Sequence, residues 1–377
     1  MRVLGFGTYD TQRHPRVGVL LDGMRALGLD VTELVHPLGL TTAERVRILQ
    51  QPWRVPSLVV RLVTRWARLV AGAAGQRPEV VLVGYMGHFD VLLARGVFPR
   101  STIVLDHLVF AAGTATDRGT RPGLRTWLLS LLDRAAIAAA DVIVVDTEEH
   151  GELVPDRRRK DTVVAPVGAP LEWFAAGAAA RTGLTGRDGT SPLTVVFYGL
   201  FTPLQGTPVI GRALRLLHER GVAVRTTLVG DGQDAAEVRA ELEGFSEVHW
   251  RAWVGPDELP ALVAEHDVCL GVFGDEGKAL RVVPNKVYQG AAAGAAIVTS
   301  DTAPQRRVLD GCAVLVTPGD PAALADALAD LAGDAEALAA WRSRAAGLAG
   351  RAFTPAAVAA PVVDALRTRP NRRAGAR

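Results

Sequence analysis

Short apolar runs alternate with longer amphipathic stretches along most of this chain of 377 residues. Apolar runs between turn residues are typical of the buried strands of a parallel sheet, and amphipathic stretches are typical of the helices that cover it. Because the pattern runs through the first half and then restarts, we expect two Rossmann-like α/β domains. In such folds a ligand binds at the carboxyl ends of the strands, here in a cleft that the two domains face.

The pattern assigns the elements of each half. In the first half we expect strands at 2–5, 30–35, 79–84, 101–106, 141–146 and 162–167, and helices at 15–27, 57–71, 124–139 and 147–153. In the second half we expect strands at 193–198, 225–229, 248–251, 268–272, 296–299 and 313–316. Helices are expected there at 208–220, 235–242, 256–264, 284–293, 304–309, 321–332 and 355–366.

Composition shifts suggest where the domains begin and end. Residues 174–192 contain no convincing element and predict a linker between an N-terminal domain, 1–173, and a C-terminal domain, 193–350. A last helix at 351–367 is expected to pack back on the N-terminal domain. The basic tail, 368–377, is expected to be disordered.

The overall composition excludes several classes of protein. A net charge of +2 gives no general attraction for nucleic acid. Cys269 and Cys312 lack the spacing of a zinc site and are expected to be reduced thiols, so no metal and no cofactor is predicted. We expect no signal peptide and no membrane-spanning helix, hence a cytoplasmic protein.

The clearest motif is a strand followed by Gly199, Thr202, Gly206 and Thr207, with Pro208 opening a helix. Glycines let backbone amides approach an anion, and a helix N-terminus carries about half a positive charge. Thr207 is expected to cap the helix. The motif therefore suits a phosphate group, although an ordinary turn between strand and helix has the same pattern.

Two further turns of the second half fit the same ligand. Gly230 and Asp231 lie between a strand and a helix, as in many structural turns. Lys278, Arg281 and Lys286 surround a helix start at Pro284, where side-chain charge and helix dipole add together. A solvated basic face is the alternative for these three cations. Basic residues are otherwise almost all arginine, which is typical of a GC-rich genome.

The first half offers its own polar turns at strand ends. Gly7 follows the first strand, and Tyr85, His88 and Asp90 follow the third, where such groups suit a polyhydroxylated acceptor. The alternative there is a capped helix with a packed tyrosine. Asp106 and His107 end the fourth strand, in a place that suits binding or catalysis as well as a structural role.

The stretch 57–71 is rich in arginine. Arg61, Arg65 and Arg68 share one helical face, whereas Leu58, Leu62 and Leu69 share another. Peripheral contact with an anionic bilayer would use such a helix, and a plain surface helix of the domain is the alternative.

Together these motifs resemble the retaining GT-B glycosyltransferases of the large group 1, family 4, in an actinobacterial form. The resemblance covers nearly the whole chain and is strongest over 193–320, from the turn at 199–206 to Val283-Pro284-Asn285-Lys286 and Thr317-Pro318-Gly319-Asp320. It implies transfer of a sugar, with retention and without a metal, from a nucleotide-diphosphate donor to a small-molecule natural product or a lipid. The N-terminal domain would bind the acceptor and the C-terminal domain the donor.

The resemblance also implies roles for individual residues. Catalysis would fall to His107 or Asp106, beside the reacting sugar. Acceptor contacts would come from Gly7, His14, Arg16, Tyr85, His88 and Asp90. Donor contacts would come from Gly199, Thr202, Gly206, Thr207, Gly230, Asp231, Trp253, Lys278, Arg281, Asn285, Lys286, Tyr288 and Gln289.

Three departures from the family pattern stand out. Leu200 and Gln205 stand where the family commonly has arginine and lysine, and Arg281 and Gln289 replace its pair of glutamates. A further glutamate of the family falls near Arg306 and Arg307. We expect Lys278, Arg281 and Lys286 to restore the missing positive charge.

Two other functions share this architecture. A nucleotide-sugar epimerase needs carboxylate acid and base groups, and the loss of both glutamates argues against it. A catalytically weak partner protein that binds a nucleotide sugar would tolerate all these departures. A dehydrogenase is disfavoured because the GxGxxG fingerprint is missing.

Overall fold

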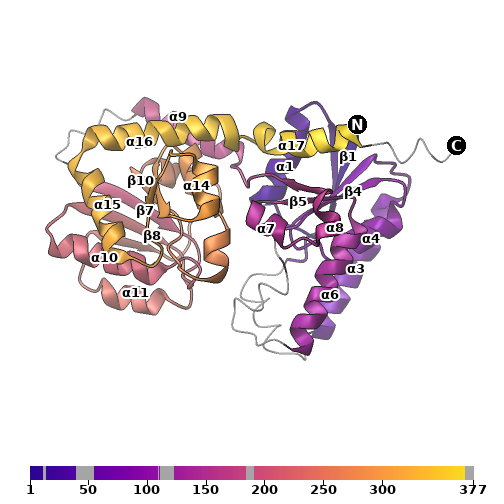
Figure 1. Ribbon diagram of the computed structural model, residues 1–377, viewed down its shortest axis with the longest axis horizontal. Coiled ribbons are helices and arrows are strands. Elements are labelled where there is room, and N and C mark those ends of the chain that lie inside the picture. The colour runs from indigo at the N-terminus through magenta and orange to yellow at the C-terminus, as the bar shows by residue number, and fades with distance from the viewer. Residues whose placement is uncertain (12–13, 40–54, 109, 111–122, 184–190, 370–377) are drawn as a thin grey trace. The chain divides into compact units, whose positions relative to one another are not determined.

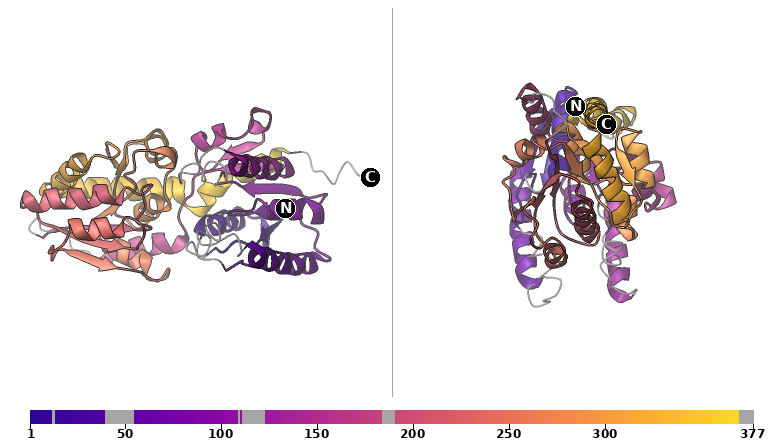
Figure 2. Two further views of the ribbon diagram at one scale, coloured as in Figure 1. Left: turned by 90° about the horizontal axis from the view of Figure 1, so that it is seen from below. Right: turned by 90° about the vertical axis from the view of Figure 1, so that its left-hand side faces the viewer.

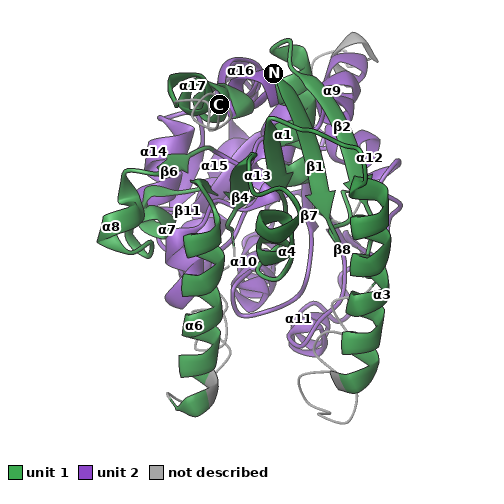
Figure 3. Cartoon of the chain, turned by 90° about the vertical axis from the view of Figure 1, so that its right-hand side faces the viewer, with its two compact units in different colours: residues 1–165, 359–377 green, residues 166–358 purple. Residues whose placement is uncertain are grey.

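The computed structural model describes the chain except for residues 12–13, 40–54, 109, 111–122, 184–190 and 370–377 (Figure 1). The chain divides into two compact units, Met1–Ala165 with Ala359–Arg377 (unit 1) and Pro166–Val358 (unit 2) (Figure 3). Each unit holds a six-stranded parallel sheet. Helices flank both sheets (Figure 2). The predicted α/β fold class with two Rossmann-like sheets is therefore confirmed.

Unit 1 has the strand order β2-β1-β3-β4-β5-β6. Its strands are β1 Arg2–Gly7, β2 Asp30–Val35, β3 Val80–Val83, β4 Thr102–Asp106, β5 Val142–Val145 and β6 Thr162–Val164. Its helices are α1 Pro15–Ala26, α3 Val55–Ala73, α4 Asp90–Val97, α6 Leu124–Ala139, α7 Glu148–Glu152 and α8 Asp156–Arg159. The helix α4 lies between the longer helices α3 and α6 (Figure 3).

Unit 2 has the strand order β12-β11-β10-β7-β8-β9. Its strands are β7 Leu193–Tyr198, β8 Val224–Val229, β9 Val248–Arg251, β10 Val268–Leu270, β11 Ala296–Ser300 and β12 Val314–Val316. Its helices are α9 Leu171–Gly183, α10 Thr207–Glu219, α11 Ala235–Glu241, α12 Leu259–Ala264, α13 Asn285–Ala292, α14 Ala303–Leu309, α15 Pro321–Gly333 and α16 Ala335–Leu348. A 3-10 helix, Gly277–Arg281, precedes α13.

The central strand β7 shows why these apolar runs become parallel strands. Val195 and Phe197 point into one hydrophobic cluster, and Val196 and Tyr198 point into another on the opposite face. Successive side chains of a strand alternate between the faces of a sheet, so a strand that is covered on both sides is apolar at every position.

The segment that was expected to lack secondary structure is largely helical. Helix α9 continues to Gly183, because its alanine-rich sequence has high helix propensity and Trp173 is buried against Tyr198. The prediction of an unstructured linker over 174–192 is therefore wrong up to residue 183. Unit 2 begins at Pro166, before the expected change of domain at residue 173.

The C-terminal region runs as α16, a π-helix Ala349–Phe353 and α17 Pro355–Thr368, and residues from Ala359 onward belong to unit 1. Arg369 forms an ion pair with Asp161 of the same unit. The rest of the predicted tail, 370–377, lies outside the described residues.

One helical stretch, Ala335–Thr368, is long and apolar enough to cross a membrane by length and composition, contrary to the expectation from sequence. Of its most apolar window, 44% is buried inside the structure. Core helices meet the same criteria, so this is weak evidence for a membrane span.

The packing of Gly230 predicts a specific sensitivity to substitution. Gly230 has φ +128°, and a Cβ there would lie 1.9 Å from the carbonyl oxygen of Gly199, whereas a Cβ at Gly221, with φ +69°, would meet nothing within 4 Å. Gly221→Ala should cost about 1 kcal/mol, and Gly230→Ala about 2 kcal/mol more, because the backbone must also move. Urea unfolding monitored in parallel for both variants measures the difference, and equal losses would contradict this packing.

Candidate functional site

Two glycine turns meet at the carboxyl ends of the neighbouring strands β7 and β8. The amide of Gly199 donates to Val229 O over 3.0 Å, and the amide of Phe201 donates to Asp231 O over 3.1 Å. A Cβ at Gly232 would lie 2.3 Å from Phe201 O. The turns therefore pack backbone against backbone, which explains the glycines of the second turn, whereas Gly199 has φ +143° and faces the Lys286 side chain.

The start of α10 completes the first turn. Gly206 adopts the left-handed conformation, and a Cβ there would lie 2.4 Å from the carbonyl carbon of Phe273, just after β10. Gly206, not Thr207, is the cap residue, so the predicted capping role of Thr207 is wrong. Instead the Thr207 hydroxyl is buried without a hydrogen-bond partner in the described part of the chain. Pro208 has no N–H, and the amides of Val209 and Ile210 donate to Gly206 O, so it is the positive end of the helix dipole that suits an anion here.

Lys286, from α13, reaches into this group of turns. Its Nζ donates to Gln205 Oε1 over 2.6 Å and lies 3.7 Å from the ring centroid of Phe197. A Cβ at Gly199 would lie 3.1 Å from the same Nζ. Only 5% of Lys286 is exposed, and this burial lowers the pKa of its ammonium from 10.5 to about 7. The site thus holds a basic group whose charge depends on its surroundings.

The remaining predicted donor residues have varied environments. Lys278 and Arg281 are half-buried on the 3-10 helix, and their expected convergence with Lys286 stays a prediction. Trp253 follows β9 and is 77% exposed. Thr202 is half-buried, and Asp231 and Asn285 are exposed.

Two residues of α13 differ from the expectation. Tyr288 is fully buried, and its ring packs edge-on against Phe353 at 4.8 Å, so the predicted donor contact is replaced by a core contact. Gln289 is buried and accepts a hydrogen bond from the Tyr198 hydroxyl over 3.0 Å. Its amide oxygen therefore helps to fix β7 relative to α13.

Gln205 gained a role that sequence reasoning missed. The sequence shows only that Gln205 stands where related sequences commonly have lysine. In the structure its side-chain oxygen accepts a hydrogen bond from Lys286. The two residues are 81 positions apart, so no local pattern connects them.

In unit 1, Asp106 and Arg16 form a buried ion pair. Arg16 Nε lies 2.8 Å from Asp106 Oδ1, and Arg16 Nη1 donates to Ala165 O over 2.9 Å. Burial raises the pKa of Asp106, and the guanidinium of Arg16 opposes this rise. Both residues are at most 2% exposed and form a structural pair, and the catalytic role of Asp106 and the acceptor contact of Arg16 stay predictions.

His107 is buried at the end of β4 against other aromatic rings. Its ring centroid lies 4.4 Å from that of Phe110 and 5.0 Å from that of His88. Burial lowers the pKa of His107 to about 3, so the imidazole is neutral at physiological pH. The His107 side chain is 2% exposed, and its catalytic role stays a prediction.

Most of the predicted acceptor residues also have structural partners. Asp90 accepts from the Thr8 amide over 2.7 Å and from Trp66 Nε1 over 2.8 Å. His88 Nε2 lies 2.9 Å from Asp133 Oδ1, and both residues are buried. His14 and Tyr85 are half-buried and stack at 3.7 Å, whereas Gly7 is buried. The stacked pair is the part of this set that is open to a ligand.

Comparison with known proteins provides a context for unit 2 and for the fold. Residues 192–334 match the family model described as glycosyl transferases group 1. No curated protein matches the chain.

Several solved structures are similar to nearly the whole chain. Anabaena HepE in complex with UDP and glucose aligns with a TM-score of 0.67 at 14% identity, covering 98% of this chain and 100% of that chain. Sucrose-phosphate synthase from Thermosynechococcus elongatus gives 0.69 at 15%, covering 97% and 98%. A trehalose-phosphate synthase from Burkholderia vietnamiensis gives 0.67 at 15%, covering 98% and 100%. At such identities the likeness shows the fold, which is GT-B.

The lowered pKa of Lys286 predicts a pH dependence of stability. Between about pH 7 and about pH 10 the unfolded chain holds a proton on this lysine that the folded chain has lost, so the free energy of unfolding should increase with pH, by at most about 1.4 kcal/mol per unit. Lys286→Met should remove this contribution from the slope. Lys160→Met, at an exposed lysine, should not. Urea unfolding at several pH values in this range measures the free energy of unfolding of the wild type and of both variants. If this free energy changes with pH at the same slope in all three proteins, the lowered pKa of Lys286 is refuted.

Proposed function

We propose that this protein is a glycosyltransferase that moves a sugar from a nucleotide-diphosphate donor to a small-molecule or lipid acceptor, with retention. The observation that carries the proposal is the position of Lys286 beneath the glycine turns, beside the first turn of α10. The match of residues 192–334 to the group 1 glycosyltransferases and the GT-B fold support it.

The chemistry of this site suits a diphosphate. The dipole of α10 attracts an anion, and the ammonium of Lys286 adds a full charge once the anion raises its pKa again. In the transition state, negative charge accumulates on the departing nucleoside diphosphate, where such preorganised groups are most effective. Charge stabilisation by these groups makes no demand for a metal or a cofactor.

The proposed reaction needs no acid–base pair from the protein. Asp106 and His107 are buried, and the two family carboxylates are replaced by Arg281 and Gln289. In our proposal an oxygen of the donor phosphate accepts the proton of the acceptor hydroxyl on the face from which the diphosphate leaves. Positioning then accounts for catalysis, and front-face attack retains the anomeric configuration.

Removing the Lys286 charge should abolish transfer. We expect Lys286→Met to reduce the release of nucleoside diphosphate at least about 100-fold, since a buried charge that faces the leaving group contributes about 3 kcal/mol or more. Lys160→Met is the matched control, because that lysine is exposed on the surface of unit 1. A panel of nucleotide sugars is first screened by thermal shift, and turnover is then measured with the stabilising donor.

Each outcome of this experiment has a distinct meaning. Release of nucleoside diphosphate that survives in Lys286→Met would refute the assignment. An epimerised sugar nucleotide without release would identify an epimerase, and donor binding without any turnover would identify a binding partner. The anomeric configuration of the product, measured by NMR, tests retention.

Within unit 1, we propose peripheral contact with the cytoplasmic face of an anionic membrane. The valines at 59 and 63 of α3 are about half exposed, and the leucine at 124 and tryptophan at 127 of α6 more so. In Figure 3 the lower ends of α3 and α6 extend past α4. Exposed apolar stripes on two projecting helices, with Arg61 and Arg68 exposed on α3, suit a surface of anionic lipid.

This contact predicts charge-dependent binding to vesicles. The wild-type chain should float with vesicles that contain phosphatidylglycerol and not with neutral ones. The double variant Arg61→Ser/Arg68→Ser should bind about 30-fold more weakly, at about 1 kcal/mol per arginine, and Trp127→Ser should also weaken binding. Arg157→Ser removes an exposed charge elsewhere on unit 1 and is the control. Equal flotation of all four proteins, or none by the wild type, would contradict the proposal.

A further inference from the structure

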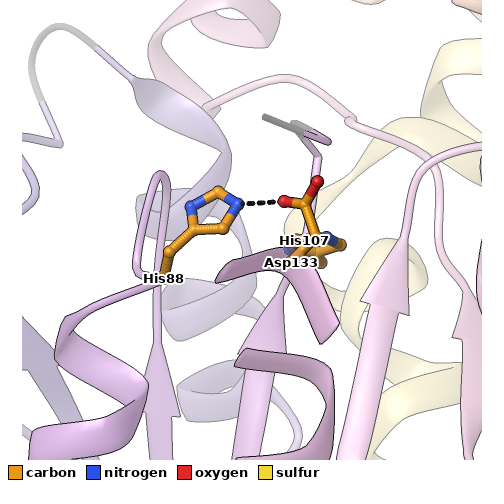
Figure 4. Close-up of side chains that lie close together, drawn as sticks. All are labelled: His88, His107 and Asp133. Carbon is orange, nitrogen blue, oxygen red and sulfur yellow. Dashed lines mark hydrogen bonds and ion pairs between the residues drawn. The ribbon is translucent and has the colours of Figure 1, made fainter. Parts of the chain in front are cut away.

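Unit 1 buries three side chains that offer metal-ligand atoms close together. One ligand atom from each of His88, His107 and Asp133 lies within 4.8 Å of the others, and all three residues are buried. His88 comes from the turn between β3 and α4, His107 from the end of β4, and Asp133 from α6 (Figure 4). Three separate segments of the chain thus converge on one point.

The hydrogen bonds of this cluster leave capacity for a further partner. His88 Nε2 and Asp133 Oδ1 are 2.9 Å apart, as the dashed line in Figure 4 shows. Nε2 of His107 is buried and has no hydrogen-bond partner among the described residues, although 2% of this residue is exposed. A buried polar atom without a partner is costly, and a ligand that binds to the imidazole would offset that cost.

We propose that His88, His107 and Asp133 bind a zinc ion. Two imidazoles and one carboxylate are a ligand set that zinc accepts, with a fourth, open position for water. Ligand atoms around tetrahedral zinc are about 3.3 Å apart, so the cluster needs shifts of about 1 Å or less to close around the ion. Nitrogen ligands disfavour magnesium and calcium, which prefer oxygen.

The ion would act on the structure of unit 1 and takes no part in the proposed transfer. It would join α6, whose first turns expose an apolar stripe, to the sheet through β4 and to the turn before α4. Because such a site does not exist in the unfolded chain, its binding energy becomes folding energy. The expectation of no metal came from the two cysteines and from the family resemblance, and it did not consider this set.

A second buried pair provides a matched control. His150 Nδ1 lies 2.5 Å from Asp146 Oδ1, and both residues are buried in the same unit. In the described residues this pair belongs to no group of three ligands that meets the same distance limit. It is therefore a buried His–Asp pair like His88–Asp133, but without a third ligand. The variant His150→Gln shows how the loss of a buried histidine affects the protein when no proposed metal ligand is removed.

The test uses the full chain without an affinity tag, freed of metal by a chelator. We expect one equivalent of Co²⁺ to give the absorption bands of a tetrahedral site, Zn²⁺ to displace it, and Mg²⁺ to have no effect. Saturating Zn²⁺ should raise the Tm by roughly 5 °C. Asp133→Asn and His88→Gln should weaken zinc binding at least about 100-fold, and His150→Gln should leave it unchanged.

Two results would overturn the inference. One is that the wild-type chain fails to bind one equivalent of cobalt or zinc. This result does not depend on any variant. The other is equal zinc binding by Asp133→Asn and His150→Gln, when both variants have circular dichroism spectra like that of the wild type. The metal would then bind elsewhere, and His88 and Asp133 would form a hydrogen bond without a metal role. Metal binding is measured without a sugar donor, so its failure is separate from failure of the proposed transfer.

Discussion

The close approach of the Gly199 and Gly230 turns is the constraint on which the rest of unit 2 depends. Because Gly230 has no Cβ, the backbones of the two turns meet directly at the ends of β7 and β8. Gly206 allows the same approach to the chain after β10. Three neighbouring strands thereby end in one small area that is built from backbone, and backbone amides are the groups that hold phosphate without regard to side-chain type.

Lys286 turns this backbone surface into a charged site. A lysine at 5% exposure is costly as a cation, and Gln205 and the Phe197 ring offset part of that cost. The consequence is a pKa near neutrality, so the charge becomes fully established when an anion arrives.

Unit 1 shows a different use of polar residues. Among the residues that the structure describes, the buried pairs Arg16–Asp106, His88–Asp133 and His150–Asp146 fix helices to strand ends or to the turns that follow them. From the sequence alone, a polar residue at a strand end indicates catalysis or acceptor binding. Arg16, Asp106 and Asp90 have partners that the sequence does not reveal, and this is why a polar residue at such a position is weak evidence for function.

The sequence by itself determined the fold class, because the alternation of apolar runs and amphipathic stretches depends only on local periodicity. It also located the glycine turns and Lys286, since strand, glycine and helix start follow one another along the chain. Tertiary structure alone decided which polar residues are satisfied. The Lys286–Gln205 contact spans 81 positions and the Arg16–Asp106 pair spans 90. Such pairings arise only when strand order brings distant turns together, and no local pattern encodes them.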